Sequence, residues 1–332
     1  MSERLKTTWK SLKRSAQHSE SGVVSDPLPD RMELFFRRRQ LHLRRMWLRT
    51  LVRAEQDVDP PRDPIFIIGC PRSGTTLLFR LLQRHVDVGT PGGEGHILWN
   101  TFQHPRERGW SSDRLLEDDI EPRERKFFYA AIRKMTGEGR FLDKTPRNCL
   151  RIPYLLELFP GARFVLLKRD GPPTVSSLIE GWRVRHGISY RLPERLELAE
   201  YRGRLWSYLL PPGWRELKHT TIADVAARQY VAAYENALTD IKRVPQELVT
   251  EITYESLVSR PVPVIEALLE DLRLPPSAEV VSMASDLSKH EVQVNSPPRP
   301  DKWKQRADEV ARIFPTISPT TRRLGYKDTL DL

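Results

Sequence analysis

The chain has 332 residues, of which 39% are hydrophobic and 30% are charged. This length is enough to bury a large core, and it fits one α/β domain with extensions. The formal net charge is +10, and residues 1–56 supply +7 of it because they hold 13 basic and 6 acidic side chains. The rest of the chain is only mildly basic and has no basic-aromatic recognition motif, so nucleic acid is not expected as a partner.

Cysteine usage and hydropathy indicate the compartment. Only Cys70 and Cys149 are present, so a disulfide framework is not expected and a reducing compartment is indicated. The first residues lack the apolar run of a signal peptide, and no segment approaches the roughly 20 apolar residues that span a bilayer. We therefore expect a cytoplasmic protein whose contact with a membrane is confined to the surface.

The N-terminal region is predicted to be a separate arm over residues 1–58. Residues 1–29 are polar and rich in serine, so we expect most of them to be disordered. A basic amphipathic helix is predicted after Asp30, with two apolar stripes: Met32, Phe36, Leu43, Trp47 and Ala54 form one, and Leu34, Leu41 and Leu48 form the other. Two stripes imply two covered surfaces, the protein body and either an anionic membrane or a second copy in a homodimer. The alternative is an arm packed on its own domain, with solvated arginines.

Residues 59–332 show the strand, loop and helix alternation of an α/β fold. The apolar run 65–69 is too short for a helix and rich in β-branched residues, so it predicts a buried parallel strand, and a helical segment follows from Thr75. Residues 163–170 and 173–182 repeat the strand and the helix. The pattern predicts a parallel sheet flanked by helices, with helical insertions, and it places ligands at the carboxyl ends of the strands.

The loop between the first strand and its helix, Gly69–Thr76, has the spacing of a nucleotide phosphate-binding loop. Gly74 permits close approach of the backbone, Ser73 and Thr75 offer hydroxyls and amides, and the helix adds its positive end. The alternative interpretation is a plain glycine turn between a strand and a helix.

One position of this loop departs from the nucleoside-triphosphatase pattern. Where those loops carry a lysine after the second glycine, this chain has Thr75, and the cation of the loop is Arg72 instead. Such a loop is poorly suited to hold a γ-phosphate with Mg²⁺.

Four blocks of the sequence resemble PAPS-dependent sulfotransferases, in particular the branch that contains the tyrosylprotein sulfotransferases and many bacterial enzymes. The blocks are PRSGTT at 71–76, residues 141–182, residues 252–258, and KW at 302–303 with LGY at 324–326. They follow the order of the family across residues 62–327. The resemblance implies a P-loop-type sulfotransferase domain over 59–332, which moves a sulfuryl group from 3′-phosphoadenosine-5′-phosphosulfate (PAPS) to an acceptor hydroxyl.

The resemblance also implies site residues. Arg169 and Ser177 match the arginine and serine that bind the 3′-phosphate of PAPS, and both fall at the carboxyl edge of the predicted sheet. Lys144 matches the catalytic lysine of the tyrosylprotein enzymes, which would stabilise charge on the leaving phosphate. The implied cofactor-binding set is completed by Arg72, Ser73, Gly74, Thr75 and Thr76 in the loop and by Tyr254, Ser296 and Lys302 toward the C-terminus, with Trp303 near the adenine.

A base must accept the proton of the acceptor hydroxyl. Glu94 lies close to the position of the glutamate base in that branch, one residue off in loop length, and His96 is the alternative. No metal is expected to be required, because Arg72, Lys144 and the loop amides already oppose the charge, and Arg72 is expected to act in catalysis as well.

The least family-like segments, 95–140 and 183–225, are expected to roof the acceptor site. The second, with Trp182 directly before it, contributes aromatic residues that suit sugar or aryl faces but that also form cores, namely Trp182, Tyr190, Trp206, Tyr208 and Trp214. Carbohydrate, glycolipid, phenolic and tyrosine hydroxyls stay open as acceptors, and the basic arm suggests a lipid-linked one. The alternative functions are a kinase-like phosphoryl transferase and a non-catalytic nucleotide-binding scaffold on the same fold.

Overall fold

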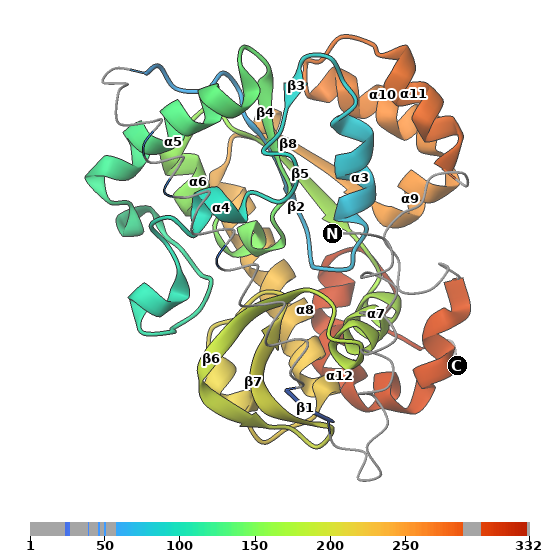
Figure 1. The fold of residues 1–332 in the computed structure, drawn as a ribbon. Coiled ribbons are helices and arrows are strands. Elements are labelled where there is room, and N and C mark those ends of the chain that lie inside the picture. Colours follow the sequence, from blue (N-terminus) through green and yellow to red (C-terminus); the bar gives the residue numbers. More distant parts are fainter. Residues whose placement is uncertain are drawn as a thin grey trace, which may run out of the picture.

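Five parallel strands form the central sheet of the computed structural model, which describes residues 24–26, 39, 46, 50, 58–287 and 300–330 (Figure 1). Their order across the sheet is β3 (Val88–Gly89), β4 (Arg140–Asp143), β2 (Ile65–Ile68), β5 (Arg163–Lys168) and β8 (Val249–Thr253). The chain begins in the middle at β2, crosses to the edge at β3, returns beside β2 as β4 and continues on the other side of β2 as β5. Because all neighbours run the same way, their carboxyl ends meet at one edge of the sheet.

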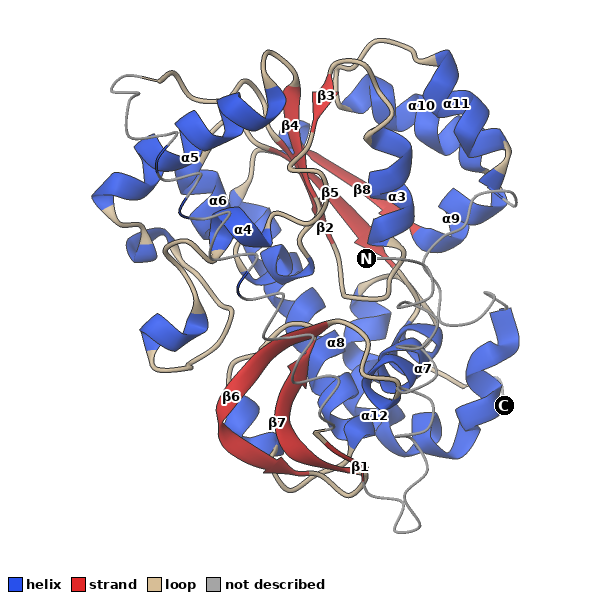
Figure 2. Cartoon of the chain, viewed as in Figure 1, coloured by secondary structure: helices blue, strands red, loops and turns tan. Residues whose placement is uncertain are grey.

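Helices cover both faces of this sheet (Figure 2). On one side lie α3 (Thr75–Leu82), α9 (Tyr254–Ser259), α10 (Pro261–Asp271) and α11 (Ala278–Ser285). On the other side lie α4 (His96–Trp99), α5 (Pro122–Thr136) and α6 (Ile152–Leu158). Both faces of the sheet are therefore buried, as is usual for parallel strands.

The core explains why an uninterrupted apolar run forms the central strand. Ile65 and Ile67 of β2 pack into a cluster with α3, α10 and α11. Phe66 and Ile68 pack into the cluster on the opposite face, with α5 and α6. All four side chains are at most 1% exposed. Successive side chains of a strand point to opposite faces of the sheet, and because both faces are buried here, no position is left for a polar side chain.

A second group of helices and a β-hairpin lies beneath the carboxyl edge of the sheet in Figure 1. It comprises α7 (Gly171–Arg183), α8 (Ile222–Asp240), α12 (Ala307–Arg323) and the antiparallel strands β6 (Ile188–Glu197) and β7 (Tyr201–Ser207). Strand β1 (Val24–Ser25) pairs with β7 in parallel. Short 3₁₀ helices occupy Pro105–Arg108, Glu117–Asp119, Pro146–Leu150, Trp214–Leu217, Ile241–Arg243, Gln246–Leu248 and Pro300–Arg306.

The α/β fold predicted from the sequence is confirmed, with small shifts at element ends. The strands expected over 65–69 and 163–170 end at Ile68 and Lys168. The helix expected over 173–182 begins earlier, at Gly171, because the Asp170 carboxylate caps it by accepting the Gly171 N–H at 2.7 Å.

Most of the N-terminal arm, including the helix expected after Asp30 and its apolar stripes, lies outside the described residues. The division into residues 1–58 and 59–332 stays a prediction. Within the tail that was expected to lack structure, Val24 and Ser25 form a strand, and the Asp26 carboxylate accepts the backbone N–H of Arg204 at 2.8 Å. Among the described residues, none of the helices combines the length and apolar character needed to cross a membrane.

The aromatic residues expected to roof the acceptor site are buried instead. Trp182, Tyr190, Trp206, Tyr208 and Trp214 are all between 0% and 8% exposed and belong to the larger core cluster. They fix the hairpin β6–β7 onto α7 and α8, so the alternative interpretation as core side chains holds for them.

Replacement of Phe66 by alanine should lower the free energy of unfolding by about 3–5 kcal/mol, the usual cost of truncating a buried phenylalanine. Its ring contacts those of Trp99, Phe141, Phe159 and Phe164 at centroid distances of 5.7 to 6.1 Å. Urea denaturation measures the loss. The control is Val86→Ala, at a side chain 89% exposed, which should cost about 0.5 kcal/mol or less; equal losses in both variants would contradict the proposed core.

Candidate active site

Predicted site residues follow four adjacent strands of the sheet at their carboxyl ends. Lys144 comes directly after β4, the loop 69–76 after β2, Arg169 after β5 and Tyr254 after β8. These strands are neighbours in the order β4-β2-β5-β8, so the sheet brings together residues that are up to 185 positions apart in sequence. This edge is where open α/β sheets bind ligands.

The backbone of loop 69–76 turns sharply before α3. Gly74 has φ 99° and forms the N-cap of α3, and its carbonyl accepts the N–H of Leu77 at 2.9 Å. A Cβ on Gly74 would lie 2.4 Å from the ring of Tyr254, so both the left-handed backbone and the close approach require glycine. Ser73 and Thr75 are buried, whereas Arg72 and Thr76 are partly exposed. The loop therefore presents the helix N-terminus together with one arginine and one hydroxyl.

Three predicted phosphate ligands are in direct contact. Arg72 Nε donates to Ser177 Oγ at 3.2 Å, and Arg169 Nη1 donates to the backbone carbonyl of Arg72 at 2.7 Å. The Arg169 guanidinium also lies over the ring of Tyr254, 4.1 Å from its centroid. Arg169 Nε is buried without a hydrogen-bond partner among the described residues, so a donor is available for an anion. We call Arg72, Arg169, Ser177 and Tyr254 the arginine cluster.

A second group contains the candidate base and the candidate catalytic lysine. Lys144 Nζ donates to Glu94 Oε1 at 2.5 Å and to Thr76 Oγ1 at 3.1 Å. His96 Nε2 lies 2.6 Å from Glu94 Oε2, so the carboxylate contacts a basic side chain on each oxygen. We call Lys144, Glu94, His96 and Thr76 the lysine cluster.

The charge environment of Glu94 affects its ability to accept a proton. Burial acts to raise the pKa of its carboxyl, but the hydrogen bond and charge of His96 and those of Lys144 outweigh burial and hold this pKa well below its usual range. With the side chains in these positions, Glu94 is ionised and is a weak base. Lys144 is the more deeply placed partner, with a side chain 5% exposed against 35% for Glu94.

The loop that carries Glu94 and His96 is held by Asp143, a residue that the sequence analysis did not single out. Its Oδ1 accepts the Gly95 N–H at 2.9 Å and the Thr145 hydroxyl at 3.0 Å, and its Oδ2 accepts from Trp99 Nε1 and Asn148 Nδ2, each at 2.8 Å. Burial raises the pKa of Asp143, while the bonds from Trp99, Thr145 and Gly95 act against that shift. In the sequence, the position of this aspartate beside the candidate lysine, at the end of a buried strand, could have identified it as a site residue.

Loop 69–76 joins the two clusters into one site. Arg72 belongs to the arginine cluster and Thr76, four residues later, to the lysine cluster. The sequence hypothesis would fail if the phosphate loop lay far from the pair Arg169 and Ser177, and the contacts through Arg72 show that they are adjacent.

The predicted C-terminal site residues are described only in part. Ser296 lies outside the described residues. Lys302 Nζ lies 2.5 Å from Glu180 Oε2 on α7, three residues beyond Ser177, and Trp303 is 9% exposed and part of the core. Lys302 thus stands near the arginine cluster, and its contact with a phosphate stays a prediction.

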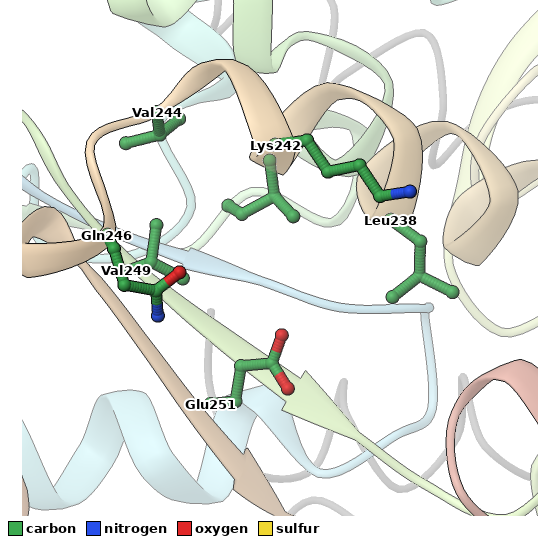
Figure 3. Close-up of a pocket in the computed structure, with 7 residues that line it drawn as sticks. Leu238, Lys242, Val244, Gln246, Val249 and Glu251 are labelled. Atoms are coloured by element: carbon green, nitrogen blue, oxygen red, sulfur yellow. The ribbon is translucent and has the colours of Figure 1, made fainter.

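A pocket of about 390 Å³ lies apart from both clusters. Figure 3 shows its lining, which includes Leu238 and Lys242 near the end of α8 and Val249 and Glu251 from β8. It contains none of the predicted site residues, and Glu251 is already paired with Lys168 at 2.8 Å. We assign no role to this pocket.

Fold and candidate site together are those of an α/β protein with a phosphate-binding type of loop at the carboxyl edge of a parallel sheet. A family model described as "Sulfotransferase family" matches residues 64–278. Since this match covers more than half of the chain, the protein belongs to the sulfotransferase family. It is an enzyme of PAPS-dependent sulfuryl transfer, which displaces the alternatives of a kinase-like transferase and a non-catalytic scaffold.

Individual relatives support the same family. The protein-tyrosine sulfotransferase A of Caenorhabditis elegans is 25% identical over 313 residues, which cover 83% of this chain and 70% of the relative. The protein-tyrosine sulfotransferase of Drosophila melanogaster is 28% identical over 79% of this chain, which spans about half (51%) of the length of the relative. Among solved structures, sulfotransferase STF9 from Mycobacterium avium shares the fold, with a TM-score of 0.57 at 17% identity over 88% of this chain and 83% of that chain.

Both cysteines are free and buried, and burial raises the pKa of each thiol above its ordinary value. Buried thiols with raised pKa values are unreactive, so both cysteines act as packing residues. In the described part of the chain, no three His, Cys, Asp or Glu side chains come together as ligands for a metal ion.

Proposed function

We propose that the arginine cluster and the amides of loop 69–76 bind the two phosphate groups of PAPS, and that the lysine cluster acts on the sulfuryl group and on the acceptor hydroxyl. The observation that carries this proposal is the position of Arg72, which contacts both Ser177 and Arg169. A nucleotide with phosphates on the 5′ and 3′ positions requires two anion sites at a fixed spacing. The loop and the pair Arg169 and Ser177 supply two such sites.

The transfer itself requires placement and charge stabilisation. The acceptor oxygen, the sulfur and the leaving oxygen must lie in line, and the sulfur–oxygen bond to the phosphate breaks as the bond to the acceptor forms. Negative charge then develops on the leaving phosphate oxygen, where Lys144, Arg72 and the N-terminus of α3 are proposed to stabilise it. These cations are the reason why we propose that the enzyme needs no metal.

Glu94 is proposed as the base and His96 as the residue that orients it. The carboxylate is a weak base while it is bonded to Lys144. A phosphosulfate bound on the loop attracts the Lys144 ammonium, which contacts Thr76 of that loop. Once Lys144 turns toward this anion, Glu94 loses one of its two cations, and its affinity for the acceptor proton rises.

The acceptor is proposed to be a hydroxyl next to Glu94. Relatives named protein-tyrosine sulfotransferases point to a tyrosine or another phenol, whereas the basic arm favours a lipid-linked carbohydrate at an anionic membrane. The two reduced cysteines fit a cytoplasmic enzyme at such a surface.

Calorimetry with 3′-phosphoadenosine-5′-phosphate (PAP) and ADP tests the nucleotide assignment. The wild type should prefer PAP, and Arg169→Ala or Ser177→Ala should lose about tenfold or more in PAP affinity with little change for ADP, because only the 3′-phosphate is affected. The PAP affinity should be the same in EDTA. Equal affinities of the wild type for PAP and ADP would reject the proposal.

Substitution of Glu94 by glutamine should lower kcat about 10²- to 10⁴-fold, the usual contribution of a positioned base, while PAP affinity is retained. Transfer of radiolabelled sulfate from PAPS to a mixed lipid and glycan extract measures the rate. His96→Asn serves as the matched variant and should reduce kcat less, because His96 only contacts the base. A larger loss in His96→Asn than in Glu94→Gln would reverse the two roles.

Replacement of Arg37, Arg38 and Arg39 by glutamine should weaken sedimentation with phosphatidylglycerol vesicles, because each basic residue near an anionic surface contributes about 1 kcal/mol. Phosphatidylcholine vesicles are the control and should bind neither form. Equal binding of the wild type and the variant to anionic vesicles would reject a membrane role for the arm.

A further inference from the structure

The phenol of Tyr208 is buried without a hydrogen-bond partner. The residue is 8% exposed, and its hydroxyl oxygen meets no donor or acceptor among the described residues. Buried tyrosine hydroxyls elsewhere in this chain are paired, as in Tyr129 with the Leu158 carbonyl at 2.7 Å and Tyr234 with the Leu167 carbonyl at 3.1 Å. An unpaired buried hydroxyl lowers the stability of the fold, whereas a phenylalanine at the same position would not. Stability of the fold therefore does not explain why position 208 carries a hydroxyl.

The backbone at Tyr208 is in a conformation that aromatic residues rarely adopt. It follows β7 directly and has φ 65°, and its N–H donates to the Gly187 carbonyl at 2.9 Å. A bulky side chain at positive φ is strained, and such strain is found mainly where the position of a side chain matters.

This conformation places the phenol on the face of α7 that carries Ser177. A Cβ on Gly181 would lie 1.7 Å from the Tyr208 hydroxyl oxygen, so the phenol occupies the space that a side chain at position 181 would take. Gly181 follows Ser177 by four residues, and side chains at this spacing are neighbours on one helix face, about 5–6 Å apart between Cβ atoms. The hydroxyl therefore lies at the helix position one turn along α7 from Ser177.

The charged groups around the phenol are those of the candidate nucleotide site. Burial raises the pKa of Tyr208 well above its ordinary value, the positive charge of Arg72 acts in the opposite direction, and the negative charge of Glu180 adds to the rise. Arg72 in turn bonds to Ser177, and Glu180 is paired with Lys302. An anion that takes over Ser177 Oγ would release Arg72 and come within reach of the phenol.

We propose that Tyr208 is a further ligand of the nucleotide, whose hydroxyl donates to the 3′-phosphate bound by Ser177 and Arg169. This inference rests on the proposed function, since it assumes that this phosphate belongs to PAPS. It explains the unpaired hydroxyl, the left-handed backbone and the requirement for glycine at position 181.

Tyr208→Phe removes only the hydroxyl and tests the inference by calorimetry. PAP affinity should fall about tenfold, since a hydrogen bond to a charged group is lost, whereas affinity for adenosine 5′-phosphosulfate, which lacks the 3′-phosphate, should be unchanged. The melting temperature should stay the same or rise, because no hydrogen bond within the protein is lost. Tyr129→Phe is the matched control and should show the opposite pattern, a lower melting temperature with full PAP affinity. Its hydroxyl is bonded to the Leu158 carbonyl at the end of α6, before β5 begins, whereas the site follows the carboxyl ends of the strands.

The outcomes separate this inference from the proposed function. A wild type that does not prefer PAP over ADP would overturn the proposed function itself. A wild type that prefers PAP, with unchanged PAP affinity in Tyr208→Phe, would overturn only the role of Tyr208. Equal weakening toward PAP and adenosine 5′-phosphosulfate, or a lowered melting temperature, would show that the hydroxyl acts on the protein or on another part of the nucleotide.

Discussion

The hydrogen bond between Arg72 and Ser177 spans 105 residues of sequence and ties the phosphate loop to α7. The same arginine also holds Arg169, whose Nη1 donates to the Arg72 carbonyl, so the ends of β2 and β5 are linked through one residue of the loop. Arg72 has φ 71°, a conformation that costs a non-glycine residue on the order of 1 kcal/mol or more. The parallel sheet makes the arrangement possible, since β2 and β5 are neighbours and both end at this edge.

Charge is distributed over the site in two different ways. In the arginine cluster, two guanidinium groups lie close to one neutral hydroxyl, so positive charge is available for an anionic ligand. In the lysine cluster, the Glu94 carboxylate is matched by Lys144 and His96, so charge is internally compensated. A ligand that carries negative charge therefore adds favourable interactions in the first cluster and redistributes existing ones in the second. This difference supports separate roles for the two clusters in binding and in chemistry.

Local patterns in the sequence were sufficient for the central fold, and the family resemblance supplied the candidate site residues that the fold brings to one edge of the sheet. The apolar runs of β2 and β5, the glycine loop and the spacing of Arg169 and Ser177 predict elements that the structure contains, because each depends on neighbouring residues. Contacts made across the sequence could not be predicted in the same way. The bonds from Gly95 and Trp99 to Asp143 and the position of Tyr208 against Gly181 arise from packing between elements that only the fold brings together. The aromatic residues of 183–225 were ambiguous for the same reason, since one composition suits both a core and a binding wall.

The pairing of β1 with β7 has a consequence for any shortened form of the protein. In the three-stranded sheet β1-β7-β6, the N-terminal segment covers one side of β7, and Asp26 accepts from Arg204 at its end. A chain that began after the arm would leave the amide and carbonyl groups along β7 without these partners. Open strand edges of this kind recruit strands from other molecules, so such a truncation would favour self-association even with its nucleotide site intact.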